Sequence, residues 1–116
     1  MHFHANYVST SVFGDGDCYQ ATFEAEQDTD DPDSPYLLIQ RQFEDPDDYR
    51  CYIETHHEKY CGHFLLCRVD LTPQKLSIEL DRPKDNFVSV TSAMVATEFA
   101  EASQVVKIIS GEIEPP

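Results

Sequence analysis

The sequence has few basic residues and no long hydrophobic run, and each shortage argues against a class of function. It contains 8 Lys or Arg against 22 Asp or Glu among 116 residues, which gives a formal net charge of −14. Nucleic acids and anionic membranes are polyanions, so this charge argues against both as partners. It fits a basic protein instead, which long-range attraction would bring in quickly. No apolar stretch reaches the length that a transmembrane helix needs.

A secretion signal is also missing. Residues 1–10 lack both a basic region and a continuous apolar core, so we expect a cytoplasmic protein. Reduced thiols are then expected at the four cysteines, which are Cys18, Cys51, Cys61 and Cys67. The length predicts a single domain, 1–116, that is large enough to bury one core without cross-links.

Motifs that hold cofactors are equally scarce. The sequence has no glycine-rich loop that could cradle a phosphate, and no basic stripe with interleaved aromatic residues. The run that starts at Asp28 begins like a helix–loop–helix calcium site. That motif needs glycine at its sixth position and glutamate at its twelfth, where this chain has Asp33 and Ile39. We therefore predict no cofactor, no bound metal and no catalytic residue, so the protein is not expected to be an enzyme.

The centre of the chain carries the clearest structural signal, an alternation of apolar and polar residues. This period of two is typical of half-buried β-strands, and it predicts four consecutive strands at 36–43, 50–55, 64–71 and 76–80. The last two are joined by a short connector containing Pro73, which predicts a hairpin. Within 64–71 we expect a core face made by Leu65, Cys67, Val69 and Leu71.

The strand at 36–43 begins apolar on both faces. A strand of this kind is usually central and covered on both sides. We therefore expect the C-terminal helix to lie over its second face.

The two ends of the chain complete the predicted fold. Strands at 2–13 and 19–26 flank a glycine-containing turn at 14–17 and form a second hairpin. A further strand is predicted at 87–95. Residues 97–110 change to helical spacing, with Thr97 as a cap and Gly111 as a stop. Several β-branched residues in that segment leave a strand as the alternative.

The prediction is thus an α+β fold: a mainly antiparallel β-sheet built from hairpins, with one C-terminal α-helix packed on the sheet. The strands at 2–13 or 87–95 could be sheet edges, through which a second copy of the chain could pair as a homodimer.

Two acidic loops, one on each side of strand 36–43, are the strongest candidates for a binding surface. Between Asp15 and Asp48 the only basic residue is Arg41. Because the strand separates them, the loops should lie about 25 Å apart at its two ends. The predicted partner-binding residues are Asp28, Asp30, Asp31, Asp33, Glu44, Asp45, Asp47 and Asp48. The alternative is that these are ordinary solvated loops.

Cysteine and histidine are dense around the turn at 56–63, which raises a different hypothesis. A small metal- or thiol-dependent enzyme or sensor could use residues within 51–67, centred on Cys51, Cys61, His63 and Cys67. The spacing does not match the usual ligand pairs of structural zinc sites. A thiol nucleophile would also need a base held in place by a third group, and no local signature supplies one.

Four short segments within 35–81 form a distinctive series: Tyr36–Arg41 (YLLIQR), Tyr52–Glu54 (YIE), the turn at Gly62 and Leu76–Leu80 (LSIEL). In the order and spacing of these segments the stretch resembles the bacterial immunity protein 10 family. The glycine-rich turn of the family is reduced here to residues 60–63. The resemblance implies an immunity protein of a polymorphic toxin system. Such a protein binds a cognate toxin domain, often a basic nuclease, and blocks it by masking rather than by chemistry.

Overall fold

The computed structural model describes residues 1–43 and 48–116, and in this part of the chain it has one α-helix and two β-sheets. The α+β class and the single C-terminal helix are therefore confirmed. The strands are β1 (His2–His4), β2 (Tyr7–Phe13), β3 (Cys18–Glu24), β4 (Tyr36–Gln42), β5 (Cys51–Thr55), β6 (Gly62–Phe64), β7 (Leu66–Thr72), β8 (Lys75–Leu80) and β9 (Phe87–Thr91), and the helix is α1 (Ala96–Ile109).

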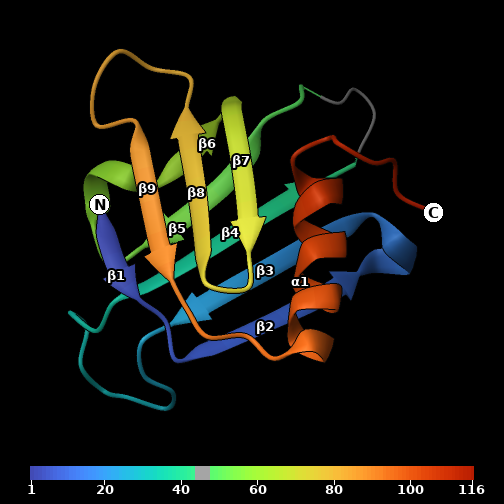
Figure 1. Ribbon diagram of the computed structural model, residues 1–116. Helices are drawn as coiled ribbons and strands as arrows, with labels where there is room; N and C mark the ends of the chain where they lie inside the picture. Colours follow the sequence, from blue (N-terminus) through green and yellow to red (C-terminus); the bar gives the residue numbers. More distant parts are fainter. Residues whose placement is uncertain (44–47) are drawn as a thin grey trace.

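The two sheets face each other and their strands cross (Figure 1). The four-stranded sheet has the order β1-β9-β8-β7, and the five-stranded sheet has the order β2-β3-β4-β5-β6. Neighbouring strands are antiparallel except for β1 and β9. The predicted hairpins around 14–17 and between β7 and β8 are both present.

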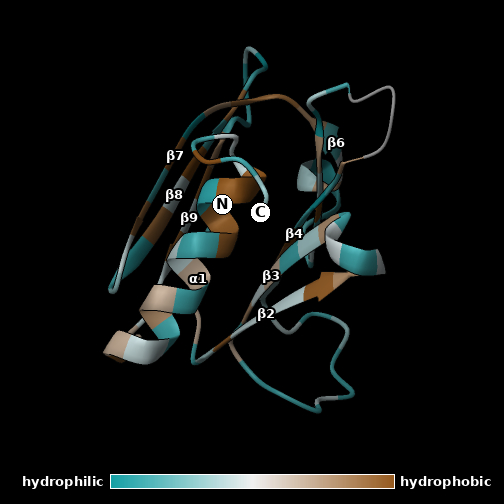
Figure 2. Cartoon of the chain, turned by 90° about the vertical axis from the view of Figure 1, so that its right-hand side faces the viewer, coloured by the Kyte–Doolittle hydropathy of each residue, from teal (hydrophilic) through white to brown (hydrophobic). Residues whose placement is uncertain are grey.

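Helix α1 extends the layer of the four-stranded sheet. It lies beside β7 and contacts the inner side of β2, β3 and β4 (Figures 1 and 2). A single core forms between the layers because both sheets and the helix turn apolar residues inward. Its fully buried large side chains include Phe23, Leu37, Ile39, Ile53, Leu76, Ile78, Leu80, Val88, Val90, Ile108 and Ile109.

This arrangement corrects the expectation for 36–43. The buried residues of β4 are Leu37, Ile39 and Arg41, and they share one face. Helix α1 meets that same face, because the guanidinium of Arg41 donates a hydrogen bond to the carbonyl of Ile109. The helix therefore does not cover the second face of β4, where Leu38 is only half-buried.

The N-terminal segment 2–13, predicted as one strand, divides between the sheets. The backbone N–H of Ala5 bonds Thr91 in the four-stranded sheet, whereas that of Asn6 bonds Glu24 in the five-stranded sheet. The chain changes layer at this point. Phe3 and Ala5, before the change of layer, are buried, whereas Tyr7, after it, is 43% exposed.

The predicted strand 64–71 also changes sheet, at Leu65. Residues before it belong to β6 and residues after it to β7, with an irregularity in pairing between Leu66 and Arg68. The expected core face is therefore wrong in part: Leu65 and Cys67 are exposed, while Val69 and Leu71 are half-buried. An alternation in sequence cannot reveal a strand that leaves one sheet for another.

Of the two C-terminal elements, the strand is shorter than the predicted 87–95, whereas the helix has the predicted length and begins one residue earlier. Strand β9 ends at Thr91, and it is an interior strand rather than an edge, because β1 and β8 lie on either side of it. The helix is capped at Val95, whose backbone N–H donates to the side chain of Glu98, and not at Thr97. Gly111 follows the helix with φ of +80°, which confirms it as the stop.

Candidate functional site

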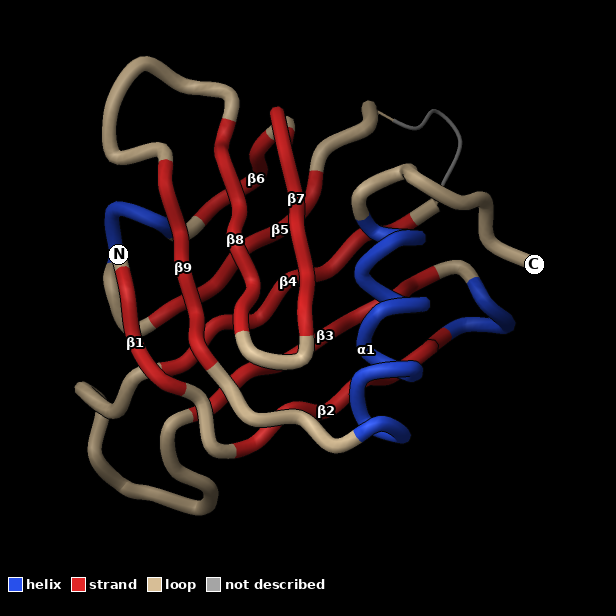
Figure 3. The backbone as a smooth tube through the Cα atoms, in the orientation of Figure 1, coloured by secondary structure: helices blue, strands red, loops and turns tan. Residues whose placement is uncertain are grey.

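Four of the predicted acidic residues lie in the loop that leads from β3 into β4, whereas Asp48 follows β4 in the chain and precedes β5. Figure 3 shows the strands that this loop joins. Asp28, Asp30, Asp31 and Asp33 are exposed in the loop between β3 and β4. That loop is held by local bonds, among them 2.9 Å between the N–H of Asp33 and Oδ1 of Asp31. Asp48 is exposed and pairs with Arg50.

The other predicted acids, Glu44, Asp45 and Asp47, fall outside the described residues. Of the second predicted group only Asp48 is described, and the role of all these residues in binding stays a prediction.

The cysteines and histidines around 51–67 are not brought together. Cys51 faces the core, and its thiol lies 3.4 Å from the carbonyl of Ile109. The thiol of Cys61 contacts the backbone N–H and carbonyl of Thr55, both at 3.3 Å. His63 lies on the opposite side of the same sheet, because it pairs with Tyr52 whereas Cys51 pairs with Phe64.

The remaining thiol, Cys67, is exposed on β7 in the other sheet. Desolvation and the carboxylates of Asp81 and Glu79 raise its pKa. It is therefore a poorer nucleophile at neutral pH than an ordinary cysteine. In the described part of the chain, no group of three His, Cys, Asp or Glu side chains could hold a metal ion. The geometry gives no support to an enzyme or sensor built on these residues.

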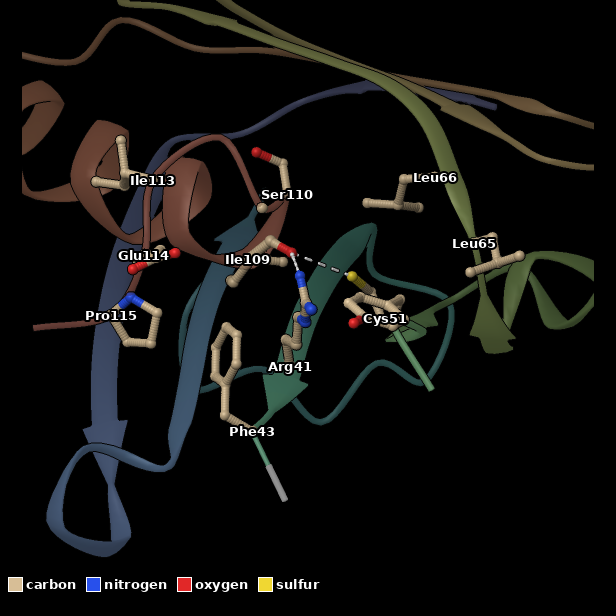
Figure 4. A pocket seen from close by; sticks show the side chains of 12 residues that line it. Arg41, Phe43, Cys51, Leu65, Leu66, Ile109, Ser110, Ile113, Glu114 and Pro115 are labelled. Carbon is tan, nitrogen blue, oxygen red and sulfur yellow. Dashed lines mark hydrogen bonds between the residues drawn. The ribbon is translucent and has the colours of Figure 1, made fainter. Parts of the chain in front are cut away.

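A hollow of about 660 Å³ opens where the C-terminal tail crosses the end of the sandwich (Figure 4). Its lining residues include Arg41, Phe43, Cys51, Leu66 and Ile113. Arg41 is 7% exposed and donates through Nη1 to the carbonyl of Ile109 at 3.2 Å. Its guanidinium also lies 4.5 Å from the centre of the Phe43 ring.

These contacts give Arg41 a structural role. A buried cation at the last turn of a helix satisfies a terminal carbonyl and opposes the negative end of the helix dipole. Arg41 thereby ties β4 to α1. The hollow brings a thiol close to this arginine but has no histidine in its lining, so it lacks the parts of a cysteine–histidine site.

The outer side of the five-stranded sheet is a second surface, which we call the open face. The four-stranded sheet and α1 lie together on the inner side of this sheet (Figure 1). Strand pairing and burial give the outward side chains of the open face as Tyr7, Ser9, Ser11, Gln20, Thr22, Glu24, Tyr36, Leu38, Gln40, Tyr52, Glu54 and His63. They are half-buried or exposed, as expected of a sheet face turned to solvent.

Glu54 lies between two tyrosines on this face. Its Oε2 accepts a hydrogen bond from the hydroxyl of Tyr36 at 3.1 Å, and its Oε1 accepts one from Tyr52 at 3.0 Å. Burial and the bond to Glu54 raise the pKa of Tyr36 to about 12. The bond to Glu54 likewise raises the pKa of Tyr52. Both phenols therefore remain protonated donors at physiological pH, and the carboxylate is fixed in position.

Neighbouring contacts order the surroundings of this cluster. The ring of His63 lies 5.2 Å from that of Tyr52, centre to centre. Gln40 donates to Gln20 at 3.1 Å across the adjoining strands. Leu38 is the cross-strand partner of Glu54 and adds an apolar surface at its side.

The open face carries negative charge alone. Among its outward residues only Glu24 and Glu54 are charged, and neither forms an ion pair within the described chain. The nearest basic residue along the strand, Arg50, lies at the rim and pairs with Asp48. By contrast, the outer side of the four-stranded sheet mixes both signs, with Arg68 and Lys75 beside Asp70 and Glu79.

The sequence analysis predicted the strand at 50–55 but not this cluster. In the structure, Cys51, Ile53 and Thr55 are buried and alternate with the half-buried Tyr52 and Glu54. The position of Tyr36 beside Glu54 depends on how β4 pairs with β5, which the alternation does not specify.

Strand β2 forms one edge of the five-stranded sheet. It has no charged residue or proline between Tyr7 and Phe13, and these residues are among the usual devices that protect a sheet edge. The expectation of an edge within 2–13 is therefore confirmed, while the homodimer stays a prediction.

Comparison with known proteins gives no relative: no family model matches the chain, and neither a curated protein nor a solved structure matches it. Among the described residues, α1 is too short and insufficiently apolar to cross a membrane.

Proposed function

We propose that the protein is a cytoplasmic immunity protein that binds a cognate bacterial toxin and neutralises it by non-covalent masking. The observation that carries this proposal is the open face, a solvated sheet surface with tyrosines and carboxylates but no lysine or arginine. Tyrosine is enriched in protein interfaces because it contributes a large amphipathic surface. The resemblance of residues 35–81 to the immunity family points to the same class of partner.

The negative charge indicates what kind of toxin would fit. A basic domain such as a nuclease exposes lysines and arginines where it grips phosphates. Carboxylates on the open face, together with the exposed acids Asp28 to Asp33, can occupy those positions in place of a nucleic acid. Neutralisation then requires only that the complex form quickly and dissociate slowly.

The proposal predicts that a toxin domain is encoded beside this gene, and co-expression of the two proteins tests it. We expect the protein to relieve growth arrest and to form a complex whose association rate falls at least tenfold between about 0.01 M and 1 M salt. A variant with Asn at positions 28, 30, 31 and 33 should associate with the toxin more slowly. Its dissociation rate should be nearly the same as that of the unmodified protein. Growth arrest unrelieved by the soluble, folded protein would reject the proposal.

A further inference from the structure

We propose that Glu54, held between Tyr36 and Tyr52, binds an arginine side chain of the partner protein. This inference rests on the proposed function for the identity of the partner, and it adds the position and chemistry of the contact. It also moves the specific contact away from the acidic loops that the sequence favoured. The acids of those loops that the structure describes, Asp28, Asp30, Asp31, Asp33 and Asp48, are exposed, and exposed charges mainly affect the rate of encounter.

The geometry of Glu54 is prepared for such a contact. Each carboxylate oxygen accepts one tyrosine hydroxyl, yet a carboxylate offers about four acceptor positions, so each oxygen can accept another donor. A guanidinium can supply two parallel N–H groups to the two oxygens. The tyrosines hold the carboxylate in place before binding, which reduces the ordering cost of the contact.

The flanking rings favour arginine over lysine. A guanidinium is planar and weakly hydrated, and it stacks on aromatic faces while its edge bonds a carboxylate. Two arginines of the chain itself make such contacts with aromatic rings: Arg41 with Phe43, and Arg82 with Phe64 at 4.9 Å and with Tyr60 at 5.3 Å from the ring centres. Lysine would present a compact, strongly hydrated charge that uses less of this arrangement.

Charge balance requires that the cation come from outside. Asp70, on the outer side of the other sheet, is neutralised by Arg68 on its own strand at 2.6 Å. Glu54 instead has tyrosine hydroxyls at 3.1 and 3.0 Å. No lysine or arginine of the described chain lies within ion-pair distance of it. Covering an unpaired carboxylate with a partner surface is unfavourable unless the partner supplies a positive charge there.

The same balance argues against a second copy of the chain as the occupant. Two open faces pressed together would bring Glu24 and Glu54 of one copy against those of the other. Neither copy has a lysine or arginine on that face to offset the repulsion.

The test uses short peptides as probes and the full chain as the protein. Acetyl-Gly-Arg-Gly-amide is titrated at low salt while the NMR signals of the protein are followed, with the lysine and citrulline peptides as comparisons. Citrulline keeps the shape of arginine without its charge. We expect saturable shifts confined to Tyr36, Tyr52 and Glu54, weaker binding of lysine, and no localised shift with citrulline.

Two variants make the test specific. Glu54→Gln should weaken the arginine peptide about tenfold, whereas Glu79→Gln should leave its binding unchanged. Glu79 is a matched control because it is also half-buried on the outward side of a central strand, and the change in net charge is identical. If Glu54→Gln disturbs the fold, Glu54→Asp, which keeps the charge and withdraws it from the tyrosines, should also bind more weakly. Equal binding by Glu54→Gln and Glu79→Gln, or shifts centred on residues 28–33, would overturn the inference.

The same pair of variants separates this inference from the proposed function. If the toxin is neutralised equally well by Glu54→Gln and Glu79→Gln, the arginine contact is rejected and the immunity function stands. If the arginine peptide binds at Glu54 but the native protein does not neutralise the toxin, the immunity function is rejected and the site stands.

Discussion

Replacing Arg41 with methionine removes the link between β4 and the end of α1. Methionine keeps a long unbranched stem in the core but has neither the charge nor the donors of the guanidinium. The carbonyl of Ile109 then retains, among the contacts described above, only the thiol of Cys51 at 3.4 Å. A thiol is a weak donor, so this buried acceptor would be poorly satisfied.

The expected cost follows from the contacts that are lost. A hydrogen bond from a charged donor contributes about 1.5–3 kcal/mol, and the stacking on Phe43 about 1 kcal/mol. Against this, the variant no longer buries a charge, and removal of that desolvation penalty offsets part of the loss. We therefore expect a decrease of about 2 kcal/mol in the free energy of unfolding, larger than a surface substitution and smaller than a deleted core side chain.

Urea denaturation followed by circular dichroism measures this quantity. With the slope of about 1–3 kcal/mol per M that is usual for small domains, the midpoint should fall by about 1 M. The control is Arg68→Met, because that side chain is 74% exposed and bonded to Asp70 on the surface. Its midpoint should hardly move. Hydrogen exchange should also accelerate in the last turn of α1 in Arg41→Met, and equal stability of the two variants would refute the structural role of Arg41.

Three further predictions concern single groups. Ultraviolet titration should show one phenol, Tyr36, ionising near pH 12, and its pKa should fall towards the usual 10 in Glu54→Gln. Because folding raises that pKa, the stability that Tyr36 contributes is complete below pH 10 and is lost as the pH rises from 10 to about 12. An unchanged pKa of Tyr36 in Glu54→Gln would contradict the role of Glu54. Gly111→Ala should lower the free energy of unfolding by about 1 kcal/mol, because φ of Gly111 is +80° and the new methyl group would lie 3.4 Å from Nη1 of Arg41. An unchanged midpoint in urea denaturation would argue against strain at this position. Brief alkylation at neutral pH should label Cys67 slowly despite its exposure, because its pKa is raised, and rapid labelling of Cys67 in mass spectrometry would contradict this prediction.

Periodicity in the sequence was sufficient to predict most elements of the fold. Alternation identified β3, β4, β5 and β8 to within one or two residues, and the change to helical spacing identified α1. These segments were predictable because each stays in one layer and buries one face. The failures lie where that condition breaks, at Ala5 and Leu65, where the chain passes from one sheet to the other.

Buried polar residues were the second source of error. Arg41 stands in the polar segment Gln40–Gln42 of its strand, yet it is 7% exposed because α1 brings a carbonyl group to its side chain. The partner is 68 residues away in sequence, and no local pattern signals it. The position of α1 was also predicted wrongly. Apolar residues on the second face of β4 suggested that the helix covers that face, whereas α1 packs on the face that carries Arg41.

The candidate site illustrates which part of an electrostatic surface can be inferred before a structure is known. Residues two apart in a strand share a face, so Arg68 with Asp70 and Tyr52 with Glu54 are same-face pairs that can be identified in the sequence. In the first pair the carboxylate is neutralised by its own strand, and in the second it receives a hydrogen bond but no opposite charge. The net charge of the chain cannot distinguish a carboxylate that is already neutralised from one that is not, although the two should respond differently to a cation from a partner. An arginine from a partner has little to gain at Asp70, whereas at Glu54 it meets an ordered carboxylate that no lysine or arginine of the described chain neutralises.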